Sequence, residues 1–349
     1  MTAISQTLTS PSSHLRPFDV GRDLNAVADL VETCFADTLD EDGRRYVQQM
    51  HAAARNPRYL RWASAVADHV SMPLTGYVWE ENGYLAGNLS LIPFLSQGRR
   101  YYLIANVAVD PSYRRRGIAR SMTMTALEHA RSRGAASIWL HVREENLAAF
   151  DLYQSLGFGE QARRSTWESG VLGRNHEPPL QVKPPPGIAV THRQRQHWSQ
   201  QRIWLKSLYP PALTWHMPFN LNTLQPGLAG RVYRLFNDTV IKQWAATQEK
   251  DLLGVLSWQP HLHHADHLWL ACSPETEDRA ISTLLPHARW ELGGMARMTL
   301  DFPARRGQAA FEAAGFHIQQ TLIWMSIPLS RETASPDRTA RAADGLAES

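Results

Sequence analysis

Hydrophobic positions at the start of the chain switch from strand spacing to helix spacing. Residues 14–18 read as a short strand, and the apolar positions between residues 24 and 35 then recur every three or four residues. This spacing predicts an amphipathic helix, with Asp23 as its N-terminal cap. A second, less regular helical pattern covers about residues 42–70.

The next part of the chain alternates strands and helices. Residues 75–94 are predicted to form a hairpin, because Asn82-Gly83 supplies the two left-handed residues that a tight turn needs. The elements predicted after it are a strand at 101–109, a helix at 118–133, a strand at 136–142 and a helix at 146–156. This order indicates an α/β fold with a mixed central sheet flanked by helices.

A proline-rich segment divides the chain. GRNHEPPLQVKPPPG, residues 173–187, contains five prolines, which exclude a helix and favour an extended linker. The expected division is a flexible N-terminus (1–12), a first domain (13–172), the linker (173–187), a second domain (188–329) and a disordered tail (330–349).

Composition and charge restrict the cellular setting and the partners. A net charge of +3 over 349 residues is too small to indicate nucleic-acid or membrane binding. The two cysteines, Cys34 and Cys272, lie in apolar stretches and are expected to be reduced thiols rather than a disulfide. Without a signal-peptide layout or a long apolar run, the protein is expected to be cytoplasmic.

Three adjacent arginines precede a predicted helix in VDPSYRRRGIAR. Like charges at a helix N-terminus are unfavourable, because the helix dipole is already positive there. A bound pyrophosphate would remove the conflict, since unpaired backbone N–H groups at a helix start bind anions. Gly117 would let the backbone approach such a ligand, and Ala119 would keep the next turn clear. The alternative is a solvated basic loop.

The loop RRRGIA and the elements around it resemble the acyl-CoA-binding core of the GNAT N-acyltransferases. That family has an R/Q-x-x-G-x-G/A loop, followed by a strand, an Asn and a Tyr-x-x-x-Gly-Phe motif, which occur here in the same order. The resemblance covers about residues 14–168 and implies the GNAT fold. Its last small loop residue is Ala119, where glycine is more common in the family.

The resemblance implies an acetyl-CoA site on the first domain. The strand edge at Val107, Ala108 and Val109 would pair with the pantetheine amides, and Asn146 would contact the cofactor near its thiol arm. The residues expected around the pyrophosphate are Arg114, Arg115, Arg116, Gly117, Ile118, Ala119 and Arg120. The resemblance requires no metal.

Two residues are candidates for proton transfer. Tyr153 stands where many family members keep a tyrosine that protonates the departing CoA thiolate, although a packed aromatic residue is the alternative. His141 stands where ribosomal-protein alanine acetyltransferases keep a glutamate base, and its free pKa near 6.5 suits proton acceptance. A structural histidine is equally compatible, and Glu80 and Glu81 are fallback bases.

The second half resembles a degenerate copy of the first. Aligning Gly157-Phe158 with Gly315-Phe316 places Phe311 opposite Tyr153, so the hydroxyl is lost. Aligning the two prolines of VAVDPSYRRRGIA and LACSPETEDRAIS places Glu277 opposite Arg114, Asp278 opposite Arg115 and Ala280 opposite Gly117. Carboxylates there would repel a pyrophosphate.

The expected function is therefore acetyl transfer from acetyl-CoA to a primary amine in a ternary complex, by a monomer or dimer. The alternatives are a non-catalytic acyl-CoA sensor or assembly module and, least favoured, a nucleic-acid binder. A histidine-rich stretch at 261–267 is expected to be a polar hairpin loop rather than a metal site.

Overall fold

The computed structural model describes residues 14–37, 39, 41–66, 72–96, 98–170, 183–214, 219–236, 239–261, 265–293 and 297–329. The expected flexible N-terminus, residues 173–182 of the expected linker, and the expected tail lie outside the described residues.

The chain divides into two compact units. Unit 1 contains Met1–Cys34, Met50–Trp139 and Ser326–Ser349, and unit 2 contains Phe35–Gln49 and Leu140–Met325. The chain therefore passes between the units at the end of the helix α1 (Val20–Phe35), within the helix α2 (Glu41–Ala54), and within two strands, β5 (Ser137–Arg143) and β12 (Phe316–Pro328). The division into domains at residues 173–187 stays a prediction.

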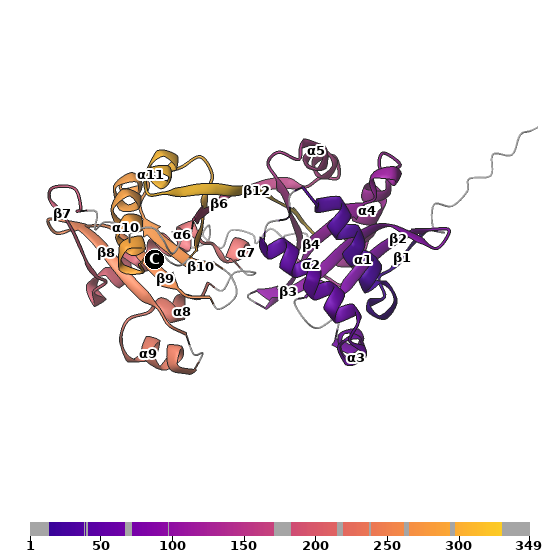
Figure 1. The fold of residues 1–349 in the computed structure, drawn as a ribbon, viewed down its shortest axis with the longest axis horizontal. Helices are drawn as coiled ribbons and strands as arrows, with labels where there is room; N and C mark the ends of the chain where they lie inside the picture. The colour runs from indigo at the N-terminus through magenta and orange to yellow at the C-terminus, as the bar shows by residue number, and fades with distance from the viewer. Residues whose placement is uncertain are drawn as a thin grey trace, which may run out of the picture. The chain divides into compact units, whose positions relative to one another are not determined.

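Unit 1 contains an antiparallel run of strands in the order β1-β2-β3-β4. Its elements are β1 (Leu15–Pro17), α1 (Val20–Phe35), α3 (Pro57–Val66), β2 (Thr75–Glu81), β3 (Tyr84–Ser96), β4 (Arg99–Val109), the 3-10 helix η1 (Pro111–Tyr113) and α4 (Ile118–Ser132). Helix α4 packs against β2, β3 and β4 through a stripe of buried side chains that includes Ile118, Met122 and Ala126, spaced four residues apart (Figure 1).

Helix α1 begins earlier than the sequence predicts, and Asp23 is not its cap. The helix starts at Val20, where Asp19 accepts a hydrogen bond from the backbone N–H of Gly21 at 2.8 Å. Asp23 lies one turn inside the helix, where it is 3% exposed and forms an ion pair with Arg16 at 2.6 Å. Asp23 also accepts a hydrogen bond from the Asp19 backbone N–H at 2.9 Å, while its ion-pair partner Arg16 comes from β1, outside the helix.

Unit 2 contains strands in the order β12-β6-β11-β10-β9-β8-β7, with β5 beside β12. The further elements are α5 (Leu147–Ser155), β6 (Gly159–Ser169), β7 (Ile188–His192), η2 (Arg195–His197), α6 (Trp198–Leu208), α7 (Pro211–Thr214), α8 (Leu221–Leu224), α9 (Gly227–Phe236), β8 (Lys242–Gln248), β9 (Asp251–Gln259), β10 (Asp266–Cys272), α10 (Glu277–Glu291), β11 (Met298–Pro303) and α11 (Gln308–Ala313). Helix α10 packs on β8 and β9 (Figure 1). The strands that precede and follow α10 in the chain, β10 and β11, pair in parallel.

The second half of the chain repeats the secondary structure of the first. The β2–β3 hairpin closes with Glu81 opposite Tyr84, and β8–β9 closes with Gln248 opposite Asp251, each across a two-residue turn. Both hairpins shift register two residues before the end of their first strand. The expectation of an α/β fold with two tandem copies is confirmed.

A glycine holds the same place in each copy. Gly87 is paired with Val109, the last residue of β4, and Gly254 with Cys272, the last residue of β10. A Cβ atom on Gly87 would come within 3.0 Å of Ile118 on α4, and one on Gly254 within 2.8 Å of Ala280 on α10. Each glycine therefore allows a helix to lie close to the sheet.

Candidate functional site

The three arginines form a tight turn at the start of α4. Arg115 and Gly117 both have left-handed backbones, with φ of +66° and +79°. Gly117 is the N-cap of the helix, and no side chain caps it. The first hydrogen bond of the helix runs from the backbone N–H of Ser121 to the carbonyl of Gly117 at 3.0 Å. The amides of Ile118 and Ala119 therefore have no acceptor within the helix, which is the arrangement that binds anions.

Side-chain hydrogen bonds and aromatic contacts stabilise the segment before this turn. Asp110 accepts hydrogen bonds from the Ser112 backbone N–H at 2.8 Å and from the Tyr84 hydroxyl at 2.6 Å. The Tyr84 ring stacks on Tyr113, and the Arg116 guanidinium lies 4.8 Å from the centre of the Tyr113 ring. The side chains of all three arginines remain exposed. The backbone of the turn is thus held, and of its exposed arginines Arg116 also forms an ion pair with Glu81, a fallback base, at 3.6 Å.

The strand before the turn contains a bulge that the sequence analysis missed. Asn106 has a left-handed backbone with φ of +50°, and β4 shifts register against β3 around it. The buried Asn88 side chain donates a hydrogen bond to the carbonyl of Asn106 at 2.9 Å. An Asn within an apolar strand was the available signal, because Asn adopts left-handed conformations more readily than most residues.

Val107 and Val109, which the sequence analysis expected at a cofactor-binding strand edge, are half-buried at the end of β4, and Ala108 is buried. The carbonyl of Val109 accepts hydrogen bonds from the Cys34 thiol at 3.3 Å and the Arg114 Nε at 3.1 Å. Burial raises the pKa of the Cys34 thiol. Cys34 is therefore a protonated donor that holds the strand end, as a reduced thiol.

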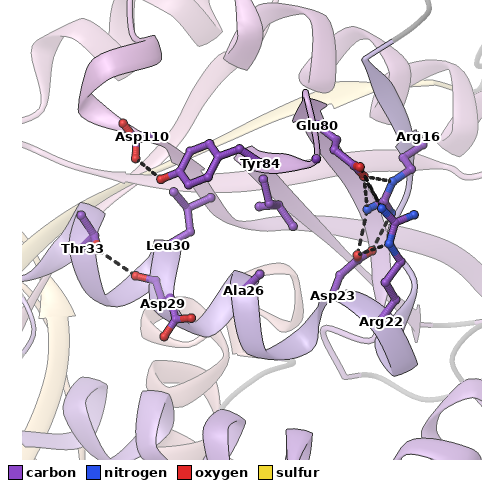
Figure 2. A pocket seen from close by; sticks show the side chains of 12 residues that line it. Arg16, Arg22, Asp23, Ala26, Asp29, Leu30, Thr33, Glu80, Tyr84 and Asp110 are labelled. Carbon is purple, nitrogen blue, oxygen red and sulfur yellow. Dashed lines mark hydrogen bonds and ion pairs between the residues drawn. The ribbon is translucent and has the colours of Figure 1, made fainter.

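A cavity of about 290 Å³ lies in unit 1 between α1 and the β2–β3 hairpin. Figure 2 shows Arg16, Arg22, Asp23 and Glu80 converging at one end of it, where Arg22 and Glu80 are 2.8 Å apart. Hydrogen bonds from Arg16 and Arg22 lower the pKa of Glu80. Glu80, one of the two fallback bases, therefore already forms ion pairs with two arginines. At the other end, Tyr84 and Asp110 connect the cavity to the arginine turn.

Asn146 and Tyr153 lie on α5 in unit 2, whereas the arginine turn lies in unit 1. Asn146 is the N-cap of α5, and its side-chain oxygen accepts a hydrogen bond from the Ala149 N–H at 3.2 Å. Tyr153 is 6% exposed and makes an edge-to-face contact with Phe158. Burial raises the pKa of Tyr153 well above its usual range. Its hydroxyl therefore stays protonated at neutral pH and can donate a proton or hydrogen bond.

His141 lies on β5, with its ring 5.0 Å from that of Trp324 on β12. Solvent reaches the side chain, yet the protein atoms packed around it and the nearby Arg143 lower the pKa of His141 to about 4. The imidazole is thus neutral at pH 7 and can accept a proton. It is a weaker base than a free histidine, so it would act only on a donor that becomes acidic during the reaction.

The second copy lacks the arginine turn altogether, which corrects the alignment made from sequence. Asp110 and Ser273 each begin an equivalent turn, closed by Tyr113 N to Asp110 O at 2.8 Å and Thr276 N to Ser273 O at 3.2 Å. Helix α10 then starts at once, so the four residues 114–117 have no counterpart. Ala280, aligned from sequence with Gly117, is instead a buried residue inside α10.

The residue of the second copy that aligns with Tyr153 packs in the hydrophobic core. Phe311 on α11 is fully buried and stacks on Trp167, with ring centres 4.5 Å apart. It also makes an edge-to-face contact with Phe316, as Tyr153 does with Phe158. The two aromatic pairs therefore hold equivalent places, and only the first carries a hydroxyl.

Among the described residues, no three His, Cys, Asp or Glu side chains are grouped to hold a metal ion. Asp266 accepts hydrogen bonds from Trp258 Nε1 and the His261 backbone N–H, both at 2.9 Å, within the described part of the expected polar loop. His263 and His264 lie outside the described residues. Within the described ranges, no helix has the length and apolar character needed to span a membrane.

Comparison with known proteins finds similarity in the first half. Residues 28–158 match the model of the Acetyltransferase (GNAT) family. The ribosomal protein bS18 alanine N-acetyltransferase of Escherichia coli (strain K12) is 42% identical over 69 residues, which are 20% of this chain and 47% of that protein. The mycothiol acetyltransferase of Thermobispora bispora is 33% identical over 145 residues, which are 41% of this chain and 45% of that protein. The chain thus spans just under half the length of these curated relatives.

Solved structures resemble the fold over nearly the whole chain. A GCN5-related N-acetyltransferase from Sphaerobacter thermophilus aligns with 93% of this chain and 98% of its own, with a TM-score of 0.56 and 13% identity. A tandem GNAT protein from the clavulanic acid biosynthesis pathway aligns with 91% of this chain and 98% of its own, with a TM-score of 0.48 and 15% identity. At such identity the first likeness establishes the fold alone.

Proposed function

We propose that this chain, which carries a GNAT acetyltransferase domain at residues 28–158, transfers the acetyl group of acetyl-CoA to a primary amine. The observation that carries the proposal is the arginine turn, where two left-handed residues, Arg115 and Gly117, precede a helix that has no side-chain cap. The relatives that match this half are themselves named acetyltransferases.

The turn fits the diphosphate of a CoA donor. The amides of Ile118 and Ala119 are available at the positive end of the helix dipole, and the exposed arginines 114–116 add charge. Charge-assisted hydrogen bonds of this kind are about twice as strong as neutral ones. The end of strand β4 at residues 107–109 would hold the pantetheine, and Asn146 would contact it near the thiol.

Two side chains would move protons during the transfer. His141, neutral at pH 7, would accept the amine proton directly or through water as the new bond makes the amine acidic. Tyr153, which burial keeps protonated, would donate to the departing sulfur. The amine would attack directly in a ternary complex, so no covalent enzyme intermediate is expected.

The test is calorimetric titration of acetyl-CoA and CoA into the full chain. The test variant is Arg114→Glu with Gly117→Glu, and the matched control is Arg131→Glu with Gly134→Glu, at the other end of the same helix. Gly134 has a left-handed backbone like that of Gly117, with φ of +65°. We expect micromolar binding by the wild type and the control, and none by the test variant.

Thiol release with a panel of amines then separates the activities. Turnover that depends on the amine supports the transferase. Tight CoA binding with no turnover on any amine supports a non-catalytic acyl-CoA sensor instead. If the wild type does not bind CoA, or the test variant binds as well as the control, the arginine turn is not the donor site and the proposal is wrong.

A further inference from the structure

A cavity of about 710 Å³ lies in unit 2, between α6, the β8–β9 turn and the start of α10. It occupies the same place in the second copy as the 290 Å³ cavity in the first, which lies between α1 and the β2–β3 turn. Asp251 in the larger cavity is the counterpart of Tyr84 in the smaller one, since each begins the second strand of its hairpin. The fold therefore leaves a cavity here in both copies.

The polar side chains of the two cavities differ in their partners. In the unit 1 cavity Arg16 forms ion pairs with both Asp23 and Glu80. In the unit 2 cavity, the side chains of Gln200, Lys250 and Asp251 have no hydrogen bond or ion pair within the described part of the chain. These donors and acceptors are therefore available to a ligand.

An indole provides the apolar part of the unit 2 cavity. Trp204 is half-buried on α6, one helical turn after Gln200, so both side chains face the cavity from the same side of the helix. Arg279 also lines the cavity and donates a hydrogen bond to Gln248 at 2.6 Å. The lining thus combines one flat apolar face with donors and acceptors around it.

The charges that line this cavity cancel. Lys250 and Arg279 contribute two positive charges, and Glu249 and Asp251 contribute two negative charges. A ligand with several phosphates would meet both carboxylates, so its phosphates gain no net attraction. A neutral ligand with many hydroxyl groups fits better, because each hydroxyl both donates and accepts a hydrogen bond.

We propose that the unit 2 cavity binds a neutral sugar ring. The apolar C–H face of the ring would stack on the Trp204 indole, and its hydroxyls would bond to Gln200, Lys250 and Asp251. Most small-molecule sites have this combination of an aromatic wall and a few placed polar groups, in volumes of roughly 300–1,000 Å³. The site is separate from the arginine turn and does not depend on the proposed acetyl transfer.

The test is saturation-transfer NMR on the full chain, with glucose and N-acetylglucosamine as probes and AMP as the competing class. We expect both sugars to bind in the millimolar range. Gln200→Ala removes one hydrogen bond from an exposed position and should weaken binding by roughly twofold to tenfold. Trp204→Leu should weaken it by a similar factor and Trp204→Phe should restore it, because only a ring can stack. The matched control is Trp62→Leu, at an exposed tryptophan in unit 1, which should leave binding unchanged.

Three results would overturn the proposal. If neither sugar binds, the cavity is not a sugar site. If AMP binds and the sugars do not, the ligand class is wrong. If Gln200→Ala and Trp204→Leu bind sugar as the wild type does, the sugar lies elsewhere. Acetyl-CoA titration of Gln200→Ala should match the wild type, which keeps failure here distinct from failure of the proposed transferase.

Discussion

Replacing Gly117 by valine should selectively damage the donor site. Its φ of +79° is left-handed, and a β-branched side chain is a rare outlier there. An added Cβ would meet no other atom within 4 Å, so the whole effect comes from the backbone and not from a clash. Gly134 is its matched control, because it is also left-handed, also has open space around it, and follows the opposite end of α4.

The structure sets the size of both effects. Forcing a side chain into a left-handed backbone costs about 1–2 kcal/mol, so Gly117→Val and Gly134→Val should lower the free energy of unfolding by similar amounts. Only Gly117→Val also reorients the amides at the helix start. Losing one charge-assisted hydrogen bond to the diphosphate costs about 1.5–3 kcal/mol, which weakens CoA binding by roughly tenfold to 150-fold.

Urea unfolding and CoA titration of the two variants distinguish these effects. Comparing the variants with each other cancels any departure from two-state unfolding in a chain of two units. Equal loss of stability with CoA binding lost only in Gly117→Val supports the reasoning. If both variants bind CoA equally well, or both lose binding in proportion to stability, the amides of this turn do not hold the diphosphate.

Three further predictions concern unit 2. Tyr153→Phe should lower turnover by about 10²-fold or more while acetyl-CoA affinity in calorimetry stays unchanged, since only the proton donor is lost; an unchanged rate would exclude the hydroxyl. Because the pKa of His141 falls to about 4 on folding from about 6.5 in the unfolded chain, stability should decrease as pH falls from 6.5 towards 4. His141→Gln should flatten that part of the pH–stability curve in urea unfolding, and a retained slope would contradict the lowered pKa. Arg164 forms a buried ion pair with Asp301, so Arg164→Met should cost about 3–5 kcal/mol in urea unfolding and Arg164→Met with Asp301→Leu should recover most of it; a double variant no more stable than the single one would refute this account.

Local patterns predicted the elements on which the site is built. The Asn82-Gly83 pair forms the expected hairpin turn, because its left-handed backbone is a property of two adjacent residues. Helix α4 follows the expected bounds and buries the apolar side of the helix that its spacing indicates. The arginine turn was likewise predictable, since a glycine before a helix allows the left-handed backbone that Gly117 adopts.

Other features were not predicted from the sequence, because they depend on residues that are distant along the chain. Asp23 suits a helix cap, yet it binds Arg16 from another element. Arg305 and Gly307 before α11 repeat the left-handed pair of the arginine turn, a likeness of the backbone that the sequence analysis missed. There, Arg305 forms an ion pair with Glu144 at 2.9 Å and α11 has only six residues, so the resemblance is confined to the backbone.

The sequence by itself determined the order of strands and helices between residues 75 and 156, the arginine turn, and the phenylalanine at position 311, where the first copy has Tyr153. These depend on residue type and on spacing within a few positions. Only the tertiary structure decided that the second copy lacks the turn outright, that Asp23 forms an ion pair with Arg16, and that burial lowers the pKa of His141. Loop lengths, ion pairs and pKa values depend on groups that are distant in the sequence, and their free energies are set by burial and by which charges the fold places together.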